Sequence, residues 1–275
     1  MIARVPMQPP ESNRPVDHTT IVAVADRLAA AYATGPIAPI RTEFEPGDVV
    51  SAYAVQRHNT QRWIGEGRRV VGRKIGLTNP VVQRQFGVDQ PDFGALFADM
   101  CLVDGEPVAA GRALQARVEG EVALVVGRRL DQPDLALPEL LRAVEFVLPA
   151  IEVVGSRIAG WDISIVDTVA DNASSALFVL GTRPVRPEAI ELGDVTMQLS
   201  VDGVVVSQGT GRACLGHPYR AALWLARRLA EEGDALEAGD VVMTGSLGPM
   251  ASFPAGTTAV ATFGELGEVR THHET

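Results

Sequence analysis

The chain has 275 residues, of which 46% are hydrophobic and only 5% aromatic, so aliphatic side chains must fill its core. Its net charge of −10 argues against nucleic acid or an anionic membrane as a partner. The two cysteines lie far apart in the sequence, which indicates a reducing compartment such as the cytoplasm, and no run of about 18 apolar residues predicts a membrane span.

The N-terminal quarter of the chain predicts a small helical part. Residues 1–19 are rich in proline and polar residues and lack an apolar signal core, so we expect a flexible tail. Apolar residues at helical spacing predict one helix over 20–33 and a second, capped by Asp48, over 48–66. We therefore expect a helical N-terminal part over 20–68, followed by a larger domain over 69–275.

The only lysine of the chain, Lys74, stands beside 23 arginines. It lies near the end of a short strand, broken by glycines, that is predicted over 69–77. Lysine has a compact head and loses its proton more readily than arginine when desolvated, so Lys74 is a candidate functional residue; the alternative is a lysine on a solvated surface. A short helix from Pro80 follows, then a turn-forming loop in which Asp92 is interpreted as an Asx-turn residue.

The stretch 117–126 predicts a β-strand around which the rest of the chain is organised. Glu119 and Glu121 point to the same side, because successive strand side chains alternate between the two faces. Two carboxylates on a buried face repel each other and lose hydration, and a divalent cation would remove both costs; the alternative is a strand end whose glutamates face water. Gly120 lies on the other face, where the missing side chain permits close backbone approach.

A second apolar strand, predicted over 150–154 after a helix over 139–146, carries one acid, Glu152, in its middle. A lone glutamate inside such a strand is costly unless it is paired. Glu152 is therefore a natural third ligand beside Glu119 and Glu121. Three carboxylates suit a hard cation such as Mg²⁺ or Mn²⁺ rather than zinc.

The remaining chain predicts further strands and one long helix. The helix covers 219–231, and His217 at its start is interpreted as a capping or packing residue. An Asp202-Gly203 turn predicts a hairpin. The polar segment 167–175 is interpreted either as a source of donors to a ligand or as a capped turn. The predicted strands are 95–103, 107–114, 195–201, 204–207, 241–244, 257–263 and 268–271.

Motifs along the chain from about Thr20 onward resemble one enzyme family, and they occur in the family's order. The segments are Gly72–Thr78, Val88–Gly94, Leu96–Met100, Glu119–Glu121, Glu152–Arg157, Asp167–Ser174, Leu215–Pro218 and Thr244–Met250. Together they resemble the 2-keto-4-pentenoate hydratases (2-hydroxypenta-2,4-dienoate hydratases), which belong to the fumarylacetoacetate hydrolase superfamily.

The resemblance implies a fold and an active site. The fold would be α+β, with a mixed β-roll or sandwich core, flanking helices and a small helical N-terminal part, and residues 69–275 would form the catalytic domain. Glu119, Glu121 and Glu152 would hold a divalent metal, Mg²⁺ or Mn²⁺. Lys74 and Asp92 would lie in the active site as the acid and base.

The implied reaction is the addition of water to 2-hydroxypenta-2,4-dienoate, by ketonisation and conjugate addition, to give 4-hydroxy-2-oxopentanoate. Ser174, Thr244 and the Gly245 loop are expected to hold the small anionic substrate, with backbone N–H groups of the loop as donors. By analogy with the meta-cleavage pathways of aromatic catabolism that this family serves, we expect a homo-oligomer that associates with a pathway decarboxylase or aldolase.

Four alternatives remain open at this point. The first is a 4-oxalocrotonate decarboxylase, although Gln90–Gly94 resembles the hydratases more. The second is a hydratase of a longer 2-oxo-dienedioate, which would need an extra cation in its pocket. The third is an acylpyruvate hydrolase, a branch with a different third acid and a His-Glu pair that this sequence does not show. The fourth is a non-catalytic partner of another pathway enzyme, against which the intact acids and Lys74 argue.

Overall fold

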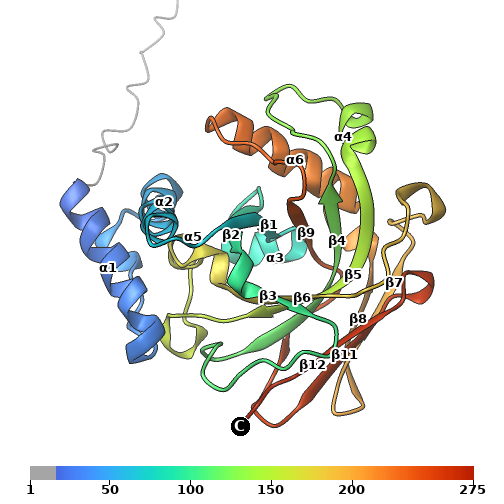
Figure 1. Ribbon diagram of the computed structural model, residues 1–275. Helices are drawn as coiled ribbons and strands as arrows, with labels where there is room; N and C mark the ends of the chain where they lie inside the picture. Colours follow the sequence, from blue (N-terminus) through green and yellow to red (C-terminus); the bar gives the residue numbers. More distant parts are fainter. Residues whose placement is uncertain (1–16) are drawn as a thin grey trace, which may run out of the picture.

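The computed structural model describes residues 17–275, so the tail predicted over 1–19 lies almost entirely outside the described residues. Its body is built from two β-sheets (Figure 1). The strands of the large sheet are β1 (Val70–Gly76), β2 (Asp92–Phe97), β3 (Cys101–Val103), β4 (Arg117–Val126), β5 (Val144–Val154), β6 (Ser175–Leu180), β9 (Val241–Ser246) and β10 (Ala251–Ser252). Those of the small sheet are β7 (Thr196–Val201), β8 (Val204–Thr210), β11 (Thr258–Thr262) and β12 (Glu268–His272).

The large sheet is mixed, and its strand order is β2-β1-β9-β4-β5-β6-β3, with β10 paired to β4. Most neighbours are antiparallel, but β1 runs parallel to β9 and β3 runs parallel to β6. The small sheet is antiparallel throughout, in the order β12-β11-β7-β8. This arrangement confirms the α+β class and the mixed sheet core that the sequence predicts.

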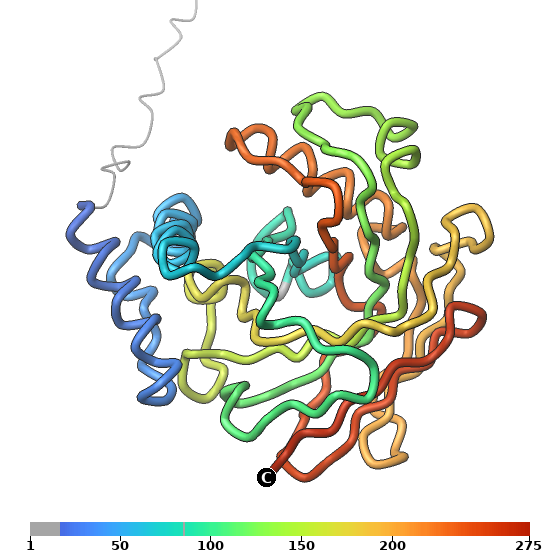
Figure 2. The backbone as a smooth tube through the Cα atoms, in the orientation of Figure 1, coloured from blue at the N-terminus to red at the C-terminus, as the bar shows by residue number. Residues whose placement is uncertain are grey.

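Six α-helices of more than one turn surround the sheets in the described residues. They are α1 (His18–Thr34), α2 (Val49–Gly65), α3 (Pro80–Phe86), α4 (Leu137–Ala143), α5 (Ile165–Ala170) and α6 (Pro218–Glu231). Figures 1 and 2 show α1 and α2 together at one side of the molecule, where they share a small apolar core with α5. No helix within residues 17–275 is long and apolar enough to cross a membrane.

Local signals in the sequence explain the ends of these helices. The Asp48 carboxylate accepts a hydrogen bond from the Ser51 N–H (3.0 Å) and so caps α2. His217 caps α6 through Nδ1, which accepts from the Tyr219 N–H (3.1 Å), as predicted. Asn79 caps α3 in the same way, and Gly87 ends it in the left-handed conformation.

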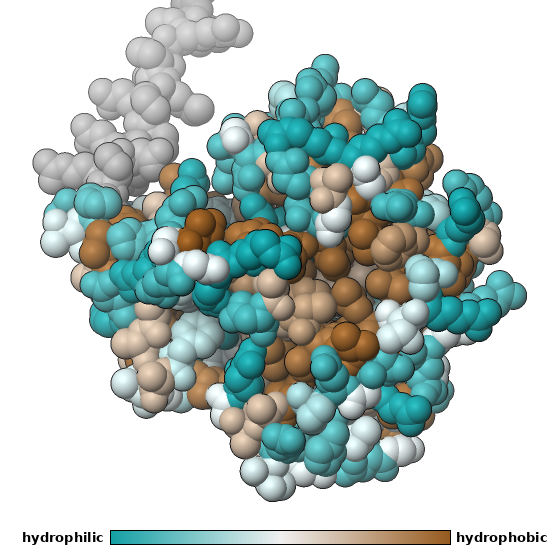
Figure 3. Space-filling view, in the orientation of Figure 1, coloured by the Kyte–Doolittle hydropathy of each residue, from teal (hydrophilic) through white to brown (hydrophobic). Residues whose placement is uncertain are grey.

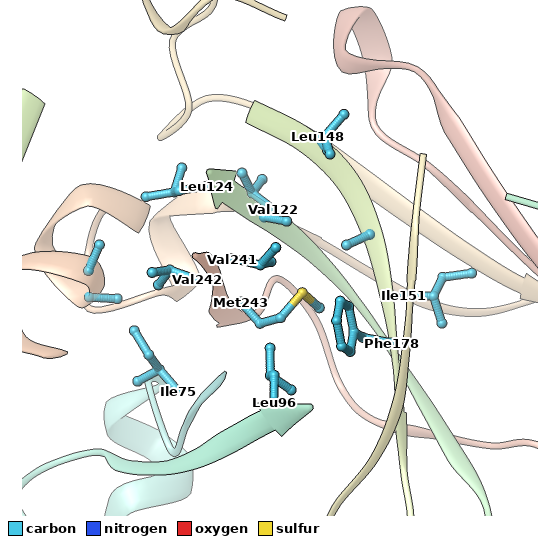
Figure 4. Packing of buried hydrophobic residues seen from close by; sticks show 14 of the residues in the cluster. Ile75, Leu96, Val122, Leu124, Leu148, Ile151, Phe178, Val241, Val242 and Met243 are labelled. Carbon is cyan, nitrogen blue, oxygen red and sulfur yellow. The ribbon is translucent and has the colours of Figure 1, made fainter. Parts of the chain in front are cut away.

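Aliphatic side chains fill the space inside the curled large sheet. Figure 4 shows Leu96 of β2 and Met243 of β9 beside Phe178 of β6, with Ile75 of β1 farther to the side in the same cluster. Each of these four side chains is at most 1% exposed. Strands that are far apart in the sequence are thus fixed against one another, which holds the polar residues between them in register.

The back of β4 packs directly against the small sheet. Gly120 has no side chain, and a Cβ added there would lie 2.8 Å from Sδ of Met197 in β7. Met197 is itself buried and fills the space that a side chain at Gly120 would need. The close approach predicted for Gly120 is therefore confirmed, and it leaves the other face of β4, with its two glutamates, directed away from the small sheet.

Four predicted elements are wrong in their extent. The strand predicted over 95–103 is split by a 3₁₀ turn at Ala98–Met100 into β2, which begins at Asp92, and β3. The helix predicted over 139–146 ends at Ala143, because Val144 already pairs with Val126 and begins β5. The strand predicted over 150–154 therefore starts six residues earlier. The segment 107–114 contributes only an isolated bridge between Val108 and His273 instead of a strand.

Asp92 is the first residue of β2 rather than an Asx-turn residue. It pairs with Gly76 at the end of β1, and its side chain is only 2% exposed. The preceding Pro91 and the acids around it favour a turn in the sequence. The pairing of β2 with β1, which joins segments separated by α3, overrides that local preference.

Candidate active site

Three glutamates meet where β4 lies beside β5. Glu119 is the direct antiparallel partner of Glu152, and Glu121 follows two residues later on the same face of β4. One carboxylate oxygen from each residue lies within 4.8 Å of the other two. The alternation of strand side chains thus brings together the three acids that the sequence singles out.

Burial makes this cluster costly without a cation. Glu121 and Glu152 are 0% exposed, and Glu119 is half-buried. Burial, and next the charge of Glu152, raises the pKa of Glu119 to about 7 and that of Glu121 well above its usual range. The pKa of Glu152 is raised as well, by burial. The folded chain therefore disfavours three ionised carboxylates unless a positive charge joins them.

The oxygens of the cluster are only partly engaged. The Gly245 N–H donates to Oε2 of Glu121 (2.9 Å), but Oε1 of Glu121 and Oε2 of Glu152 are buried and accept no hydrogen bond from the described residues. Buried carboxylate oxygens without donors are expensive. Three carboxylates that converge with free oxygens form a donor set that fits a hard divalent cation such as Mg²⁺.

Lys74 joins the acid cluster from β1. Its ammonium Nζ lies 3.1 Å from Oε1 of Glu152 and donates a hydrogen bond to the carbonyl of Ala173 (2.8 Å). Burial alone lowers the pKa of Lys74, but the carboxylates around it, Glu152 first, raise the pKa above the ordinary lysine value. Lys74 is 4% exposed, so the reading of a solvated surface lysine is wrong.

The carbonyl that accepts from Lys74 belongs to an unusual turn. Asn172, Ala173 and Ser174 all have positive φ (53°, 51° and 55°), and we call this segment the left-handed turn. Such a conformation costs a non-glycine residue about 1–2 kcal/mol. Three strained residues in a row persist only when the surrounding structure fixes them.

Two sets of buried polar contacts fix the left-handed turn. The Asn172 side chain donates to the carbonyl of Ala95 (2.9 Å) and accepts from its N–H (2.8 Å), so it pairs with β2 like a strand residue. The Arg157 guanidinium, 1% exposed, forms an ion pair with Asp171 and donates to the carbonyl of Ser175 (3.0 Å). The turn is thus clamped on both of its ends.

Asp92 lies across from Lys74 at the start of β2. Its Oδ1 is buried and accepts no hydrogen bond from the described residues. Burial raises the pKa of Asp92 to about 6, and the charge of Lys74 opposes this rise. A carboxyl group with that pKa exchanges a proton near neutral pH, as acid–base catalysis requires. A Cβ at Gly76 would collide with this carboxylate, so glycine leaves the room that Asp92 occupies.

These residues open onto a cavity of about 840 Å³. Lys74, Asp92, Glu119 and Ser174 line it, and Ser174 Oγ also lies 3.1 Å from Oγ1 of Thr168, another lining residue. Apolar side chains form much of the remaining wall. Those residues include Leu77, Val81, Val82, Phe86, Ile163, Leu247 and Met250.

Thr244 and Gly245 support the acid cluster and do not line the cavity. The Thr244 hydroxyl donates to the carbonyl of Val122 (2.8 Å), and the Gly245 N–H is taken by Glu121. A role for them in holding substrate remains a prediction, whereas Gly248 and the neighbouring Ser246 of the same loop do line the cavity.

Comparison with known proteins decides the family. Residues 69–273 match the fumarylacetoacetate (FAA) hydrolase C-terminal family. The chain is 54% identical over 248 residues to 2-keto-4-pentenoate hydratase 1 of Dechloromonas aromatica (strain RCB), which covers 90% of this chain and 94% of that protein. The chain belongs to the fumarylacetoacetate hydrolase family.

Two further proteins that are similar to this chain are informative. A 2-keto-4-pentenoate hydratase of Burkholderia vietnamiensis is 52% identical over 255 residues, covering 92% of this chain and 97% of that protein. The solved structure of 4-oxalocrotonate decarboxylase from Pseudomonas putida G7, complexed with magnesium and adipate, superposes with a TM-score of 0.90 at 30% identity, over 95% of this chain and all of that chain. The family fold thus extends through the N-terminal helices.

The sequence analysis missed two residues that line the cavity of this family member. Arg117 lies two residues before Glu119 on the same face of β4, and its guanidinium stacks over Trp161, 4.3 Å from the ring centroid. The alternation of strand side chains already places Arg117 on the side of the two glutamates. The contact with Trp161 brings together segments that are 44 positions apart and carries no sequence signal.

Proposed function

We propose that the protein is a metal-dependent hydro-lyase that adds water to 2-hydroxypenta-2,4-dienoate and forms 4-hydroxy-2-oxopentanoate. The observation that carries this proposal is the identity of more than 50% along about 90% of the chain to proteins named 2-keto-4-pentenoate hydratases. The cavity supports it, because one acid cluster, one buried lysine and one carboxyl group with a pKa near 6 surround a space of about 840 Å³.

The reaction needs two proton transfers. In the first, the 2-hydroxyl of the dienol loses a proton and C5 gains one, which gives an unsaturated 2-oxo acid. In the second, the water that adds at C4 loses a proton and C3 gains one. A divalent cation held by Glu119, Glu121 and Glu152 would act as a Lewis acid toward the oxygen atoms next to the reacting carbons. The remaining steps fall to side chains of the chain itself.

Lys74 and Asp92 are the proposed acid and base. Asp92 is buried at the start of β2 and can take a proton near neutral pH, because burial raises its pKa to about 6. The Lys74 ammonium is held by the Ala173 carbonyl and by Glu152, so its position along the cavity is fixed. The hydroxyls of Ser174 and Thr168, 3.1 Å apart, are the proposed donors toward the substrate.

The test is the ultraviolet loss of 2-hydroxypenta-2,4-dienoate in the presence of Mg²⁺, Mn²⁺ or EDTA, with identification of the product. Rapid, metal-dependent formation of 4-hydroxy-2-oxopentanoate is the expected result. No turnover by folded protein in Mg²⁺ or Mn²⁺ would exclude this substrate.

A second candidate is decarboxylation of 4-oxalocrotonate, because a decarboxylase of that substrate has the same fold with a TM-score of 0.90. Its identity of 30% is well below that of the hydratases. Release of carbon dioxide from 4-oxalocrotonate, measured beside the hydratase assay, separates the two activities. Hydration of a longer 2-oxo-dienedioate is tested in the same assay by product analysis.

We extend the proposal to the setting of the enzyme. Mg²⁺ or Mn²⁺ is the proposed cofactor, and two free cysteines support a reducing compartment such as the cytoplasm. A homo-oligomer is proposed, supported by the apolar residues gathered in the middle of the face in Figure 3. The division into a helical part over 20–68 and a catalytic domain over 69–275, and association with a pathway decarboxylase or aldolase, are proposals of the same kind.

A further inference from the structure

The catalytic cavity contains little positive charge for an anionic substrate. Among the lysines and arginines of residues 17–275, only Lys74 and Arg117 line it. Lys74 is occupied by Glu152 and the Ala173 carbonyl. Arg117 is different: its guanidinium lies over Trp161 and its charge acts on nearby Glu119, but within residues 17–275 it forms no ion pair and donates no hydrogen bond. It is the cation of the cavity that is left to bind a ligand.

The position of Arg117 relative to the acid cluster follows from strand geometry. It lies two residues before Glu119 on β4 and opposite Val154, which lies two residues after Glu152 on β5. Two residues of strand span roughly 7 Å. Lys74 is level with Met243 and so approaches the cluster from its other end. The backbone positions of Arg117 and Lys74 therefore lie on opposite sides of the three carboxylates, and the Lys74 ammonium reaches from its side to Glu152.

Arg117 is held in place by a rigid support. Its guanidinium lies over the Trp161 ring, and the indole Nε1 donates to the carbonyl of Gln115 (3.0 Å). The Gln115 side chain in turn donates to the carbonyls of Ser156 and Ile158 (2.9 and 2.7 Å) and accepts from the Gly160 N–H. Gln115 and Trp161 both have positive φ (53° and 57°), so two strained loops are tied together beneath one arginine.

We propose that Arg117, supported by Trp161, is the specificity residue that binds the C1 carboxylate of the 2-hydroxydienoate substrate. This inference rests on the proposed function and names the group that selects a monoanion. The carboxylate end then lies on the Arg117 side of the acid cluster, and the reacting carbons lie toward Lys74 and Asp92. The far end of the substrate meets the apolar wall formed by residues such as Val81, Val82 and Phe86.

A second carboxylate on the substrate has no free cation to meet. With Arg117 engaged, a distal carboxylate would be desolvated against the apolar wall without a partner, which is costly. The cavity thus selects monocarboxylic dienoates, because Arg117 binds one carboxylate and the apolar wall disfavours a second. An arginine suits this role because its planar fork pairs with both oxygens of a carboxylate.

The experiment compares Arg117→Gln, Arg117→Lys and Trp161→Phe with wild type in Mg²⁺. The control is Arg128→Gln, an exposed arginine just beyond the other end of β4. For 2-hydroxypenta-2,4-dienoate, Arg117→Gln should raise KM about 10–100-fold, as expected for a lost charge-assisted hydrogen bond, and change kcat less. Arg117→Lys and Trp161→Phe should have intermediate effects, and Arg128→Gln should match wild type.

A binding measurement keeps this test independent of turnover. Titration of 2-oxopentanoate, an unreactive monocarboxylate, into the Mg²⁺-loaded protein should give a Kd that Arg117→Gln raises by a similar factor. An unchanged Kd and KM in folded Arg117→Gln would overturn the proposal. So would a wild type that prefers 2-hydroxyhexa-2,4-dienedioate and loses only that preference in Arg117→Gln. A wild type without any hydratase activity refutes the proposed function, whereas the titration still tests Arg117.

Discussion

Two regions of the site reach their geometry in opposite ways. The three glutamates lie on regular antiparallel strands, where the register alone puts Glu119 opposite Glu152. The left-handed turn (Asn172–Ser174) lies on irregular backbone in a conformation that L-residues avoid, and it is held by the buried Arg157–Asp171 pair. In the strands, the free-energy cost comes from burying three carboxylates close together. In the turn, it comes from the left-handed backbone conformation. Lys74 connects them, because its ammonium meets Glu152 in one region and the Ala173 carbonyl in the other.

The largest effect should come from the acid cluster. Glu152→Gln removes one proposed metal ligand and the partner of Lys74, so we expect turnover to fall by at least about 100-fold, since even outer partners of metal ligands cost 10–100-fold. Mg²⁺ affinity, measured by calorimetry, should fall with it. The matched control is Glu145→Gln, an exposed residue of the same strand. Activity close to wild type in Glu152→Gln would remove Glu152 from the proposed site.

Loss of the Arg157–Asp171 ion pair, which holds the left-handed turn, should reduce the stability of the fold more than it reduces metal binding. Asp171→Asn leaves the Arg157 guanidinium buried without a counter-charge, and we expect a loss of about 3–5 kcal/mol in the free energy of unfolding. Asp162→Asn removes an ion pair whose carboxylate is 67% exposed and should cost at most about 1 kcal/mol. Urea denaturation measures both variants. Equal losses would mean that the turn does not depend on its buried clamp.

The electrostatic cost of the strands predicts a pH dependence for the metal-free protein. Burial raises the pKa of Glu119 to about 7 and that of Asp92 to about 6, so the folded chain holds protons that the unfolded chain releases above about pH 4.5. The contribution of these groups to stability therefore falls as the pH rises from about 4.5 to 7. The melting temperature in EDTA should decrease over this window, and Glu119→Gln should flatten the decrease. A decrease that Glu119→Gln leaves unchanged would contradict the assignment.

The smallest effect should come from the conformational cost of the turn. Ala173→Gly relieves left-handed strain of about 1–2 kcal/mol, which offsets a chain-entropy cost of about 0.5–1 kcal/mol and the loss of a buried methyl group worth about 0.8 kcal/mol, so stability should change by less than about 1 kcal/mol. Ala150→Gly, in the regular backbone of β5, should lose about 1–2 kcal/mol, because it gains no relief and loses a buried methyl group. Chemical denaturation of the pair is the measurement. Similar losses in both variants would show that the turn stores no strain.

The same contrast explains which parts of the site can be predicted from the sequence. The period of two in β4 and the cost of a buried acid in β5 predict the three glutamates, because both arguments need only local sequence. The lone lysine is visible in the composition. Most helix ends follow from periodicity and capping residues such as Asp48 and His217, whereas the fold class follows from the resemblance to the fumarylacetoacetate hydrolase superfamily.

What the sequence does not predict depends on distant partners. The sign of φ at Ala173 follows from clamps that join β2, Arg157 and the turn, and none of these is a neighbour in sequence. Asp92 starts a strand because β1 is there to pair with it. Helix α4 ends early because Val144 pairs with β4. In each case a long-range contact overrides a local preference.

The single lysine also makes β1 a site at which proteolysis can report on the motion of the sheet. An endopeptidase that cuts only after lysine has one cleavage site in the whole chain, between Lys74 and Ile75 in the middle of β1. β1 is hydrogen-bonded to β2 on one side and to β9 on the other, and the lysine is 4% exposed. The protease can therefore cut this bond only after β1 has separated from the sheet. The rate at which the intact chain becomes two fragments would therefore measure how often the sheet opens beside the acid cluster.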